Sequence, residues 1–130
     1  GRRQGMNVVD SSAWLAYLAG EKNAGYFAAA IEDGASLVVP TICLCEVFKV
    51  VLRERGENEA LLAVAAMQTG KVVDLDSHLA LEAATVGHEE GLALADSIIY
   101  ATARMSGALL WTQDEHFKDK PHVRFRPKPA

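Results

Sequence analysis

Four acidic side chains are the strongest candidates for chemistry in this sequence. They are Asp10, Glu46, Asp96 and Asp114. Clustered carboxylates repel one another and raise each other's pKa values, so a pocket that holds several of them needs a counter-charge. Mg²⁺ and Mn²⁺ can supply it, because both prefer oxygen ligands and keep several bound waters. Two such ions about 3.5–4 Å apart can activate a water and stabilise the leaving oxygen of a phosphodiester.

Each of these acids also has a simpler explanation when it is taken alone. Asp10 and Asp96 can cap the helices that follow them, and Asp114 can be an ordinary turn residue. Glu46 stands in the largely apolar stretch 41–52, where an acid is costly unless it is paired or binds a metal. A surface pair between Glu46 and Lys49, three residues on, is the alternative for this residue.

The elements that position these acids follow from short apolar runs and from helix start and stop signals. The predicted strands are 7–9, 36–39, 72–73, 108–112 and 123–125. The predicted helices are 13–18 after a cap at Ser11 or Ser12, 23–33, 42–55 capped by Thr41, 57–68, 78–90 capped by Asp76 or Ser77, and 96–104 started by Asp96.

Strands that alternate with helices predict an α/β fold, a central parallel sheet of four or five strands with helices on both faces. In such sheets ligands bind beyond the carboxyl ends of the strands. Asp10 and Asp114 follow predicted strands, and Glu46 and Asp96 stand near the starts of helices. We therefore expect all four carboxylates to converge at one edge of the sheet.

Length and composition restrict the class of protein. The 130 residues suit one domain, predicted over 6–126, with a tail at 127–130 and a remnant at 1–5 before the expected native start. A net charge of −4 argues against binding of nucleic acid through a broad basic field. The apolar runs are far too short for a membrane span. Cys43 and Cys45, two apart on a helix, cannot pair with each other, so we expect a cytoplasmic, reducing location.

Four segments together resemble a known family. They are Val8-Val9-Asp10-Ser11-Ser12, Glu46 in its apolar helix, Leu94-Ala95-Asp96-Ser97-Ile98-Ile99-Tyr100-Ala101-Thr102-Ala103, and Leu110-Trp111-Thr112-Gln113-Asp114-Glu115-His116-Phe117. This pattern resembles the PIN domain, and within it the VapC toxins of type II toxin–antitoxin systems. The most specific part is the acid that opens a small-residue helix, followed by a strand and a Thr-x-Asp turn.

The resemblance implies a Mg²⁺- or Mn²⁺-dependent endoribonuclease with Asp10, Glu46, Asp96 and Asp114 as its acidic quartet. It also implies supporting hydroxyl groups at Ser12 and Thr112. Gln113 stands where a basic residue is common in the family. A cognate VapB-like antitoxin is expected as partner, with an arginine that enters the acidic pocket and an apolar helix that lies beside Trp14 and the long helix.

The resemblance further implies a homodimer. The pattern agrees, because the first helix presents Trp14, Leu15, Tyr17 and Leu18 and the long helix is apolar on more than one side. Burial of the same side chains within one domain remains the alternative.

Basic side chains are candidates for phosphate contacts with RNA. Lys49 and Arg53 share a helix face with Glu46, and Arg55 and the tail add further cations. Those in the tail are Lys118, Lys120, Arg124, Arg126 and Lys128. The four histidines show no metal-ligand spacing with cysteine, so His116 and the other three are interpreted as surface or turn residues.

Three other functions stay open at this point. The chain can be a metal-free PIN-like binding module, or a housekeeping PIN nuclease without an antitoxin. A phosphoacceptor receiver domain also gathers acids at strand ends. It fits less well, because Asp74 is only a weak acceptor candidate and no lysine follows the strand at 108–112.

Overall fold

A computed structural model describes residues 5–130 of the chain. Residues 1–4, most of the segment expected to be a remnant, lie outside the described residues. Within 5–130, five strands form one parallel sheet in the order β3-β2-β1-β4-β5. The strands are β1 (Met6–Val9), β2 (Leu37–Pro40), β3 (Lys71–Val73), β4 (Ala108–Thr112) and β5 (Val123–Phe125).

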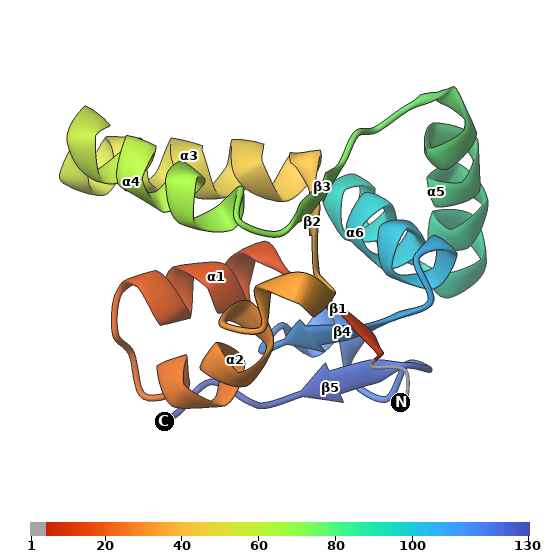
Figure 1. Ribbon diagram of the computed structural model, residues 1–130. Helices are drawn as coiled ribbons and strands as arrows, with labels where there is room; N and C mark the ends of the chain where they lie inside the picture. The colour runs from red at the N-terminus through yellow and green to blue at the C-terminus, as the bar shows by residue number, and fades with distance from the viewer. Residues whose placement is uncertain (1–4) are drawn as a thin grey trace.

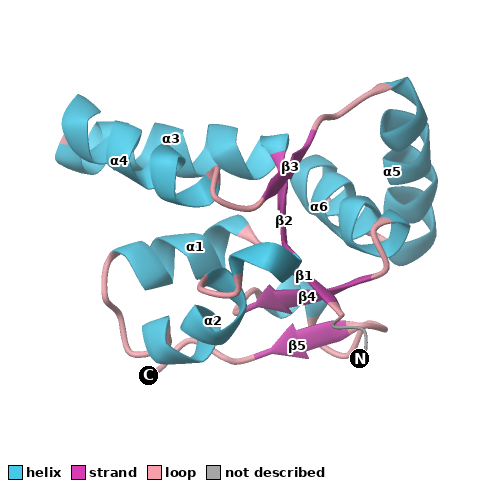
Figure 2. Ribbon diagram, in the orientation of Figure 1, coloured by secondary structure: helices cyan, strands magenta, loops and turns pink. Residues whose placement is uncertain are grey.

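Six α-helices and two short 3₁₀ turns connect the strands of this described region (Figure 1, Figure 2). The helices are α1 (Ser11–Leu18), α2 (Ala24–Ile31), α3 (Thr41–Arg55), α4 (Glu57–Met67), α5 (Ser77–Glu90) and α6 (Leu94–Met105), and the turns are Gly34–Ser36 and Glu115–Phe117. The predicted α/β fold with a parallel sheet is confirmed. No helix within 5–130 is long and apolar enough to cross a membrane.

The central strands are buried on both sides. Val8, Val9, Val38, Val39 and Leu110 have almost no exposed surface, as parallel strands covered by helices require. Figure 1 shows α1 and α2 on one side of β2 and α5 and α6 on the other. Contacts agree, because α2 packs on β1 and α6 packs on β1, β2 and β4.

Helices α3 and α4 form a pair that extends away from the sheet (Figure 1). Gly56 joins them with φ of 90°, a backbone conformation that favours glycine, and this lets the chain reverse direction. Glu46 lies in the first half of α3, on the end of the pair that is next to the sheet.

Three predicted helix starts are wrong in detail. Asp10, rather than Ser11 or Ser12, caps α1, because its carboxylate accepts the hydrogen bond from Ala13 N–H. Thr41 is the first residue of α3 and does not cap it; Pro40 stands at the cap position with no side-chain bond. Helix α6 begins two residues before Asp96, so Asp96 lies inside its first turn. Asp76 caps α5, one of the two predicted alternatives.

The strand order creates a switch point between β1 and β4. From β1 the chain first adds β2 and β3 on one side and later adds β4 and β5 on the other. In open α/β sheets a crevice forms at the carboxyl ends of such a strand pair. Asp10 directly follows β1, and Asp114 follows β4 by two residues.

Candidate metal centre

Asp10 is a buried carboxylate with a complete set of hydrogen bonds. Its Oδ1 accepts from Ala13 N–H and the Ser12 hydroxyl, both at 2.9 Å, and its Oδ2 accepts from the Thr112 hydroxyl at 2.6 Å. Burial raises the pKa of Asp10 to about 6 although these bonds lower it, and the charge of Asp114 raises it further. Ionised Asp10 therefore carries a free-energy cost at neutral pH, which a nearby cation relieves.

Thr112 links the ends of β1 and β4. Its fully buried hydroxyl donates to Asp10 and accepts from the backbone N–H of Asp114 at 2.9 Å. The Asp114 Oδ1 in turn accepts from the backbone N–H of His116 at 2.9 Å, which starts the short turn Glu115–Phe117. Ser12 and Thr112, expected beside the site, thus both contact Asp10.

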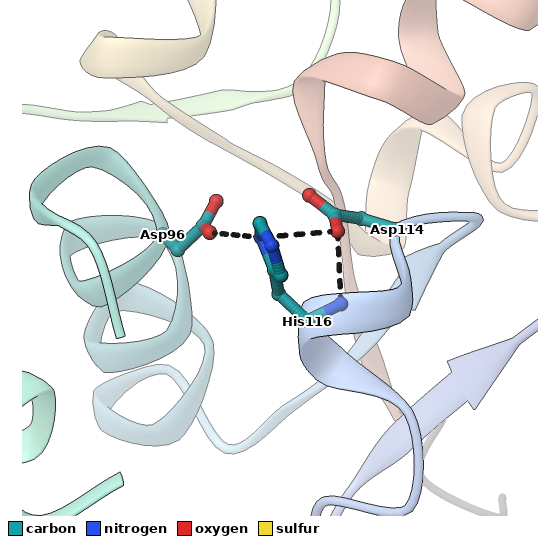
Figure 3. Close-up of side chains that lie close together, drawn as sticks. All are labelled: Asp96, Asp114 and His116. Atoms are coloured by element: carbon teal, nitrogen blue, oxygen red, sulfur yellow. Dashed lines mark hydrogen bonds and ion pairs between the residues drawn. The ribbon is translucent and has the colours of Figure 1, made fainter. Parts of the chain in front are cut away.

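Asp96 and Asp114 face each other across the ring of His116 (Figure 3). The His116 Nδ1 lies 3.2 Å from Asp96 Oδ2 and 3.3 Å from Asp114 Oδ1. Burial raises the pKa of Asp96, the charge of Asp114 raises it further, and His116 lowers it. One ligand atom from each of the three residues lies within 4.8 Å of the other two, so the cluster is compact enough to share one metal ion.

Glu46 belongs to the same edge of the sheet but not to this compact cluster. It is half-buried and accepts a hydrogen bond from the Ser11 hydroxyl at 2.7 Å. Among residues 5–130, it forms no ion pair with Lys49, the alternative weighed for it. Because Ser11 directly follows Asp10, the hydrogen bond from Ser11 brings Glu46 close to the end of β1. Burial raises the pKa of the Cys43 thiol, and the charges of Asp10 and Glu46 raise it further.

The two helix cations expected to contact RNA are on the surface. Lys49 is exposed, and Arg53 makes an exposed ion pair with its neighbour Glu54 at 3.7 Å. Gln113, which stands where the family often has a basic residue, turns its side chain inward. Its amide is buried, accepts from Asn23 at 3.1 Å and donates to the Ser12 carbonyl at 3.4 Å.

His116 is the member of the cluster that the sequence interpretation missed. Its side chain is 71% exposed, as a surface residue should be, yet its ring lies between two acids. No histidine of the sequence stands at metal-ligand spacing from a cysteine. That criterion could not find His116, because its neighbours in this cluster are aspartates. The spacing Asp-x-His after the Thr-x-Asp turn places His116 near Asp114 along the chain, but it does not predict that the ring lies between two acids.

The residues present fit a divalent cation. Among residues 5–130, no lysine or arginine nitrogen lies within 4.0 Å of the carboxylate oxygens of Asp10, Asp96 or Asp114. The carboxylates therefore have no lysine or arginine as a counter-charge within this part of the chain. Carboxylate oxygens suit Mg²⁺ and Mn²⁺, and an added imidazole nitrogen suits Mn²⁺ better than Mg²⁺.

A family model described as PIN domain matches residues 8–123. The chain belongs to the PIN domain family. The family expected from the sequence motifs is thereby confirmed, and it is a family of nucleases. The acidic edge formed by β1, β4, α3 and α6 is thus the candidate site of a PIN domain.

Solved structures share the fold of this PIN domain. A toxin–antitoxin complex from Klebsiella pneumoniae is 21% identical with a TM-score of 0.76, over 91% of this chain and 95% of that chain. VapC20 from Mycobacterium tuberculosis, a Sarcin-Ricin loop cleaving toxin, is 24% identical with a TM-score of 0.74, over 93% and 99%. DNA-bound VapBC from Salmonella typhimurium is 14% identical with a TM-score of 0.72, over 95% and 98%. The comparison with curated proteins gave no match.

Proposed function

We propose that this PIN domain is a divalent-metal-dependent endoribonuclease and the toxin of a toxin–antitoxin pair. The observation that carries the proposal is the compact cluster of Asp96, Asp114 and His116 beside buried Asp10, at the switch point of the sheet. The fold relatives, which include a toxin that cleaves the Sarcin-Ricin loop and VapBC complexes, support the toxin role.

The proposed roles follow from the position of each side chain. Asp10, Asp96 and Asp114 hold the ion through carboxylate oxygens, and Glu46 is a further ligand or positions a water. His116 can add a nitrogen ligand. When bound, Mg²⁺ or Mn²⁺ lowers the pKa of a coordinated water and stabilises charge on the phosphodiester.

The other residues keep this set in place. Ser12 and Thr112 fix the Asp10 carboxylate through one hydrogen bond each, and Ala13 N–H donates the third. A water that attacks phosphorus in line with the leaving 3′ oxygen yields a 3′-hydroxyl and a 5′-phosphate, and the leaving oxygen takes up a proton. A cytoplasmic location is also part of the proposal. It suits an RNA substrate, and it suits the two unpaired cysteines among the described residues.

Purified protein and bulk RNA provide the direct test of metal dependence. Cleavage should stop in excess EDTA and return when Mn²⁺ or Mg²⁺ is added in excess of the chelator, with 5′-phosphate ends on the products. Cleavage that persists in EDTA contradicts the proposal. RNA binding without any cleavage in Mn²⁺ favours the alternative of a non-catalytic binding module.

An antitoxin of the VapB type is the proposed protein partner. The partner helix was expected beside Trp14 and the long helix; the Trp14 side chain itself is completely buried and offers no contact surface. A groove of mixed character between α1, α3 and α4 is available instead. Its apolar lining is Leu15, Leu18, Ala19, Val50, Val51, Leu62 and Ala63, and its charged lining is Glu21, Glu54, Arg55 and Glu59. Such a groove suits the apolar face of a partner helix, and the acidic cluster suits a bidentate arginine.

Co-expression with the product of a neighbouring small open reading frame tests this partner. The two should co-purify, and the complex should lose ribonuclease activity. A cleaving enzyme that no neighbouring product binds or inhibits is instead a housekeeping PIN nuclease.

A homodimer remains part of the proposal, on the basis of the family. The apolar side chains of α1 were expected to support a dimer. They give less support than expected, since they pack in or against the core of the same domain. Large apolar side chains are most exposed on α5 and α6, at Leu81 (71%) and Leu94 (80%). Sedimentation at micromolar concentration should show a dimer, and a monomer alone contradicts this part.

A further inference from the structure

Two arginines near the C-terminus lie over aromatic rings. The Arg124 guanidinium is 5.0 Å from the centroid of Trp111, and that of Arg126 is 4.9 Å from the centroid of Tyr26. The centroids of the two rings are 5.2 Å apart and their planes are tilted by 51°, so the four side chains form one contiguous cluster. Stacking on aromatic rings holds a guanidinium in place while its N–H edge stays free to bind.

These arginines have no acidic partner in the part of the chain that the structure describes. Both are exposed, and no carboxylate oxygen of residues 5–130 lies within 4.0 Å of their nitrogens. Lys128 is also exposed and lines a shallow groove with Arg126 and Tyr26. We call Arg124, Arg126 and Lys128 the basic strip.

The basic strip begins one strand away from β4, the strand that Asp114 follows. It begins on β5, the edge strand next to β4, and continues beyond the carboxyl end of β5 toward α2 (Figure 1). The backbone N–H of Arg126 donates to the backbone carbonyl of Thr112 at 2.9 Å. The hydroxyl of the same threonine donates to Asp10. Neighbouring strands lie about 5 Å apart, so the strip starts one strand away from the crevice.

An acidic centre in a chain of net charge −4 repels a polyanion. A phosphate backbone that reaches it needs fixed cations close by, and arginine binds phosphate oxygens through two N–H groups. Resting on the proposed ribonuclease function, we propose that the basic strip binds the backbone phosphates of single-stranded RNA beside the scissile bond and guides that bond to the carboxylates. Contacts of this kind supply affinity without base specificity.

The experiment measures RNA binding apart from cleavage. Fluorescence anisotropy of a short labelled single-stranded RNA of mixed sequence, in EDTA, gives the dissociation constant over a range of salt concentrations. Arg124→Gln/Arg126→Gln should weaken binding on the order of tenfold and reduce the slope of log affinity against log salt by about 1.4, since each phosphate contact contributes about 0.7.

A matched control removes two exposed cations that lie outside the basic strip. Lys71 begins β3 and Arg104 lies in the last turn of α6, so Lys71→Gln/Arg104→Gln should leave affinity and slope close to wild type. Lys128→Glu provides a second test on an exposed tail residue, in case loss of the two stacks unfolds the protein. It should weaken RNA binding with an unchanged thermal transition.

Several results overturn the basic strip as an RNA contact. One is an RNA affinity of the strip variants equal to that of wild type. If these variants lose only antitoxin binding, the basic strip belongs to an interface with a protein partner. If the control variant weakens RNA binding as much as the strip variants do, binding depends on the net charge of the protein and not on the basic strip. A wild-type protein that neither binds nor cleaves RNA in Mn²⁺ removes the proposed function and the strip together, whereas unaltered cleavage and binding by the strip variants removes only the strip.

Discussion

At the scale of single residues, Asp10 is the most deeply buried acid of residues 5–130 and accepts the most side-chain hydrogen bonds among them. Only 2% of its surface is exposed, and its pKa of about 6 lies well above the usual value of 3.8. The folded metal-free protein therefore binds a proton at Asp10 more tightly than the unfolded chain does. Stability from this group is highest below about pH 4 and decreases as the pH rises toward about 6.

The first prediction is a pH-dependent free energy of unfolding in EDTA. Between about pH 4 and pH 6, wild type should lose up to roughly 3 kcal/mol relative to Asp10→Asn, because two pKa units correspond to about that energy. Urea unfolding of both proteins across this range measures the difference. The other titrating groups, including Asp96, are present in both proteins, so their contributions cancel in the difference. If the two curves of unfolding free energy against pH were parallel, the raised pKa of Asp10 would be ruled out.

The second prediction concerns His116 and the choice of metal. If its imidazole is a ligand, His116→Ala should weaken Mn²⁺ binding more than Mg²⁺ binding, since nitrogen ligands favour Mn²⁺. Calorimetric titration of each ion into the two proteins measures this ratio. His78→Ala, an exposed histidine near the start of α5, is the control and should change neither affinity. An unchanged ratio in His116→Ala would show that the imidazole does not bind the ion.

Residue spacing predicted the acidic edge but not its details. Asp10 and Asp114 could be placed because each follows a buried strand, and parallel strands end together. His116 could not, because its position between Asp96 and Asp114 depends on a turn of three residues and on one side-chain rotamer. The assignment of these residues as metal ligands stays a prediction.

At the scale of elements, α5 holds α6 and with it Asp96. The two helices approach closely at Gly87, where an added Cβ would overlap the Ser97 hydroxyl, the residue next to Asp96. Ser97 is buried and donates to the carbonyls of Leu92 and Ala93, so it has little room to move. The small size of residue 87 therefore helps to set the position of the first turn of α6.

The third prediction follows from this helix contact. Gly87→Ala should lower the free energy of unfolding by about 1–3 kcal/mol, the usual cost of overpacking. Gly25→Ala in α2 is the matched control, because an added Cβ there meets no atom within 4 Å. It should raise stability by about 0.4–1 kcal/mol. Thermal or urea unfolding measures both, and equal stability of the two variants would contradict the close approach.

Helix positions were predictable from the sequence, whereas helix starts were not. Apolar spacing and glycine placed all six helices, but several polar residues near each start could serve as the cap. Asp10 replaces the predicted serines at α1 because it already lies at the end of β1 with its carboxylate beside Ala13 N–H. At α3, Pro40 ends the strand and takes the cap position, which leaves Thr41 inside the helix.

At the scale of the whole molecule, strand order decides where the site lies. Alternating strands and helices predicted a parallel sheet, but short buried strands of similar composition do not specify their neighbours. The order β3-β2-β1-β4-β5 puts β1 beside β4, and thereby Asp10 beside Thr112 and Asp114. The same order makes β5 an edge strand beside β4, so Arg124 within it and Arg126 just beyond it lie one strand away from the pair that flanks the crevice.

The central claim is that this acidic edge cleaves RNA inside the cell. Sequencing of RNA 5′ ends after brief expression of wild type and of Asp96→Asn tests it most directly, because the substitution keeps the shape of the side chain and removes its charge. Wild type should generate new 5′-phosphate ends at defined positions that are absent in Asp96→Asn, while both proteins show the same thermal transition. The same new ends in both strains, or none in either, would contradict the account.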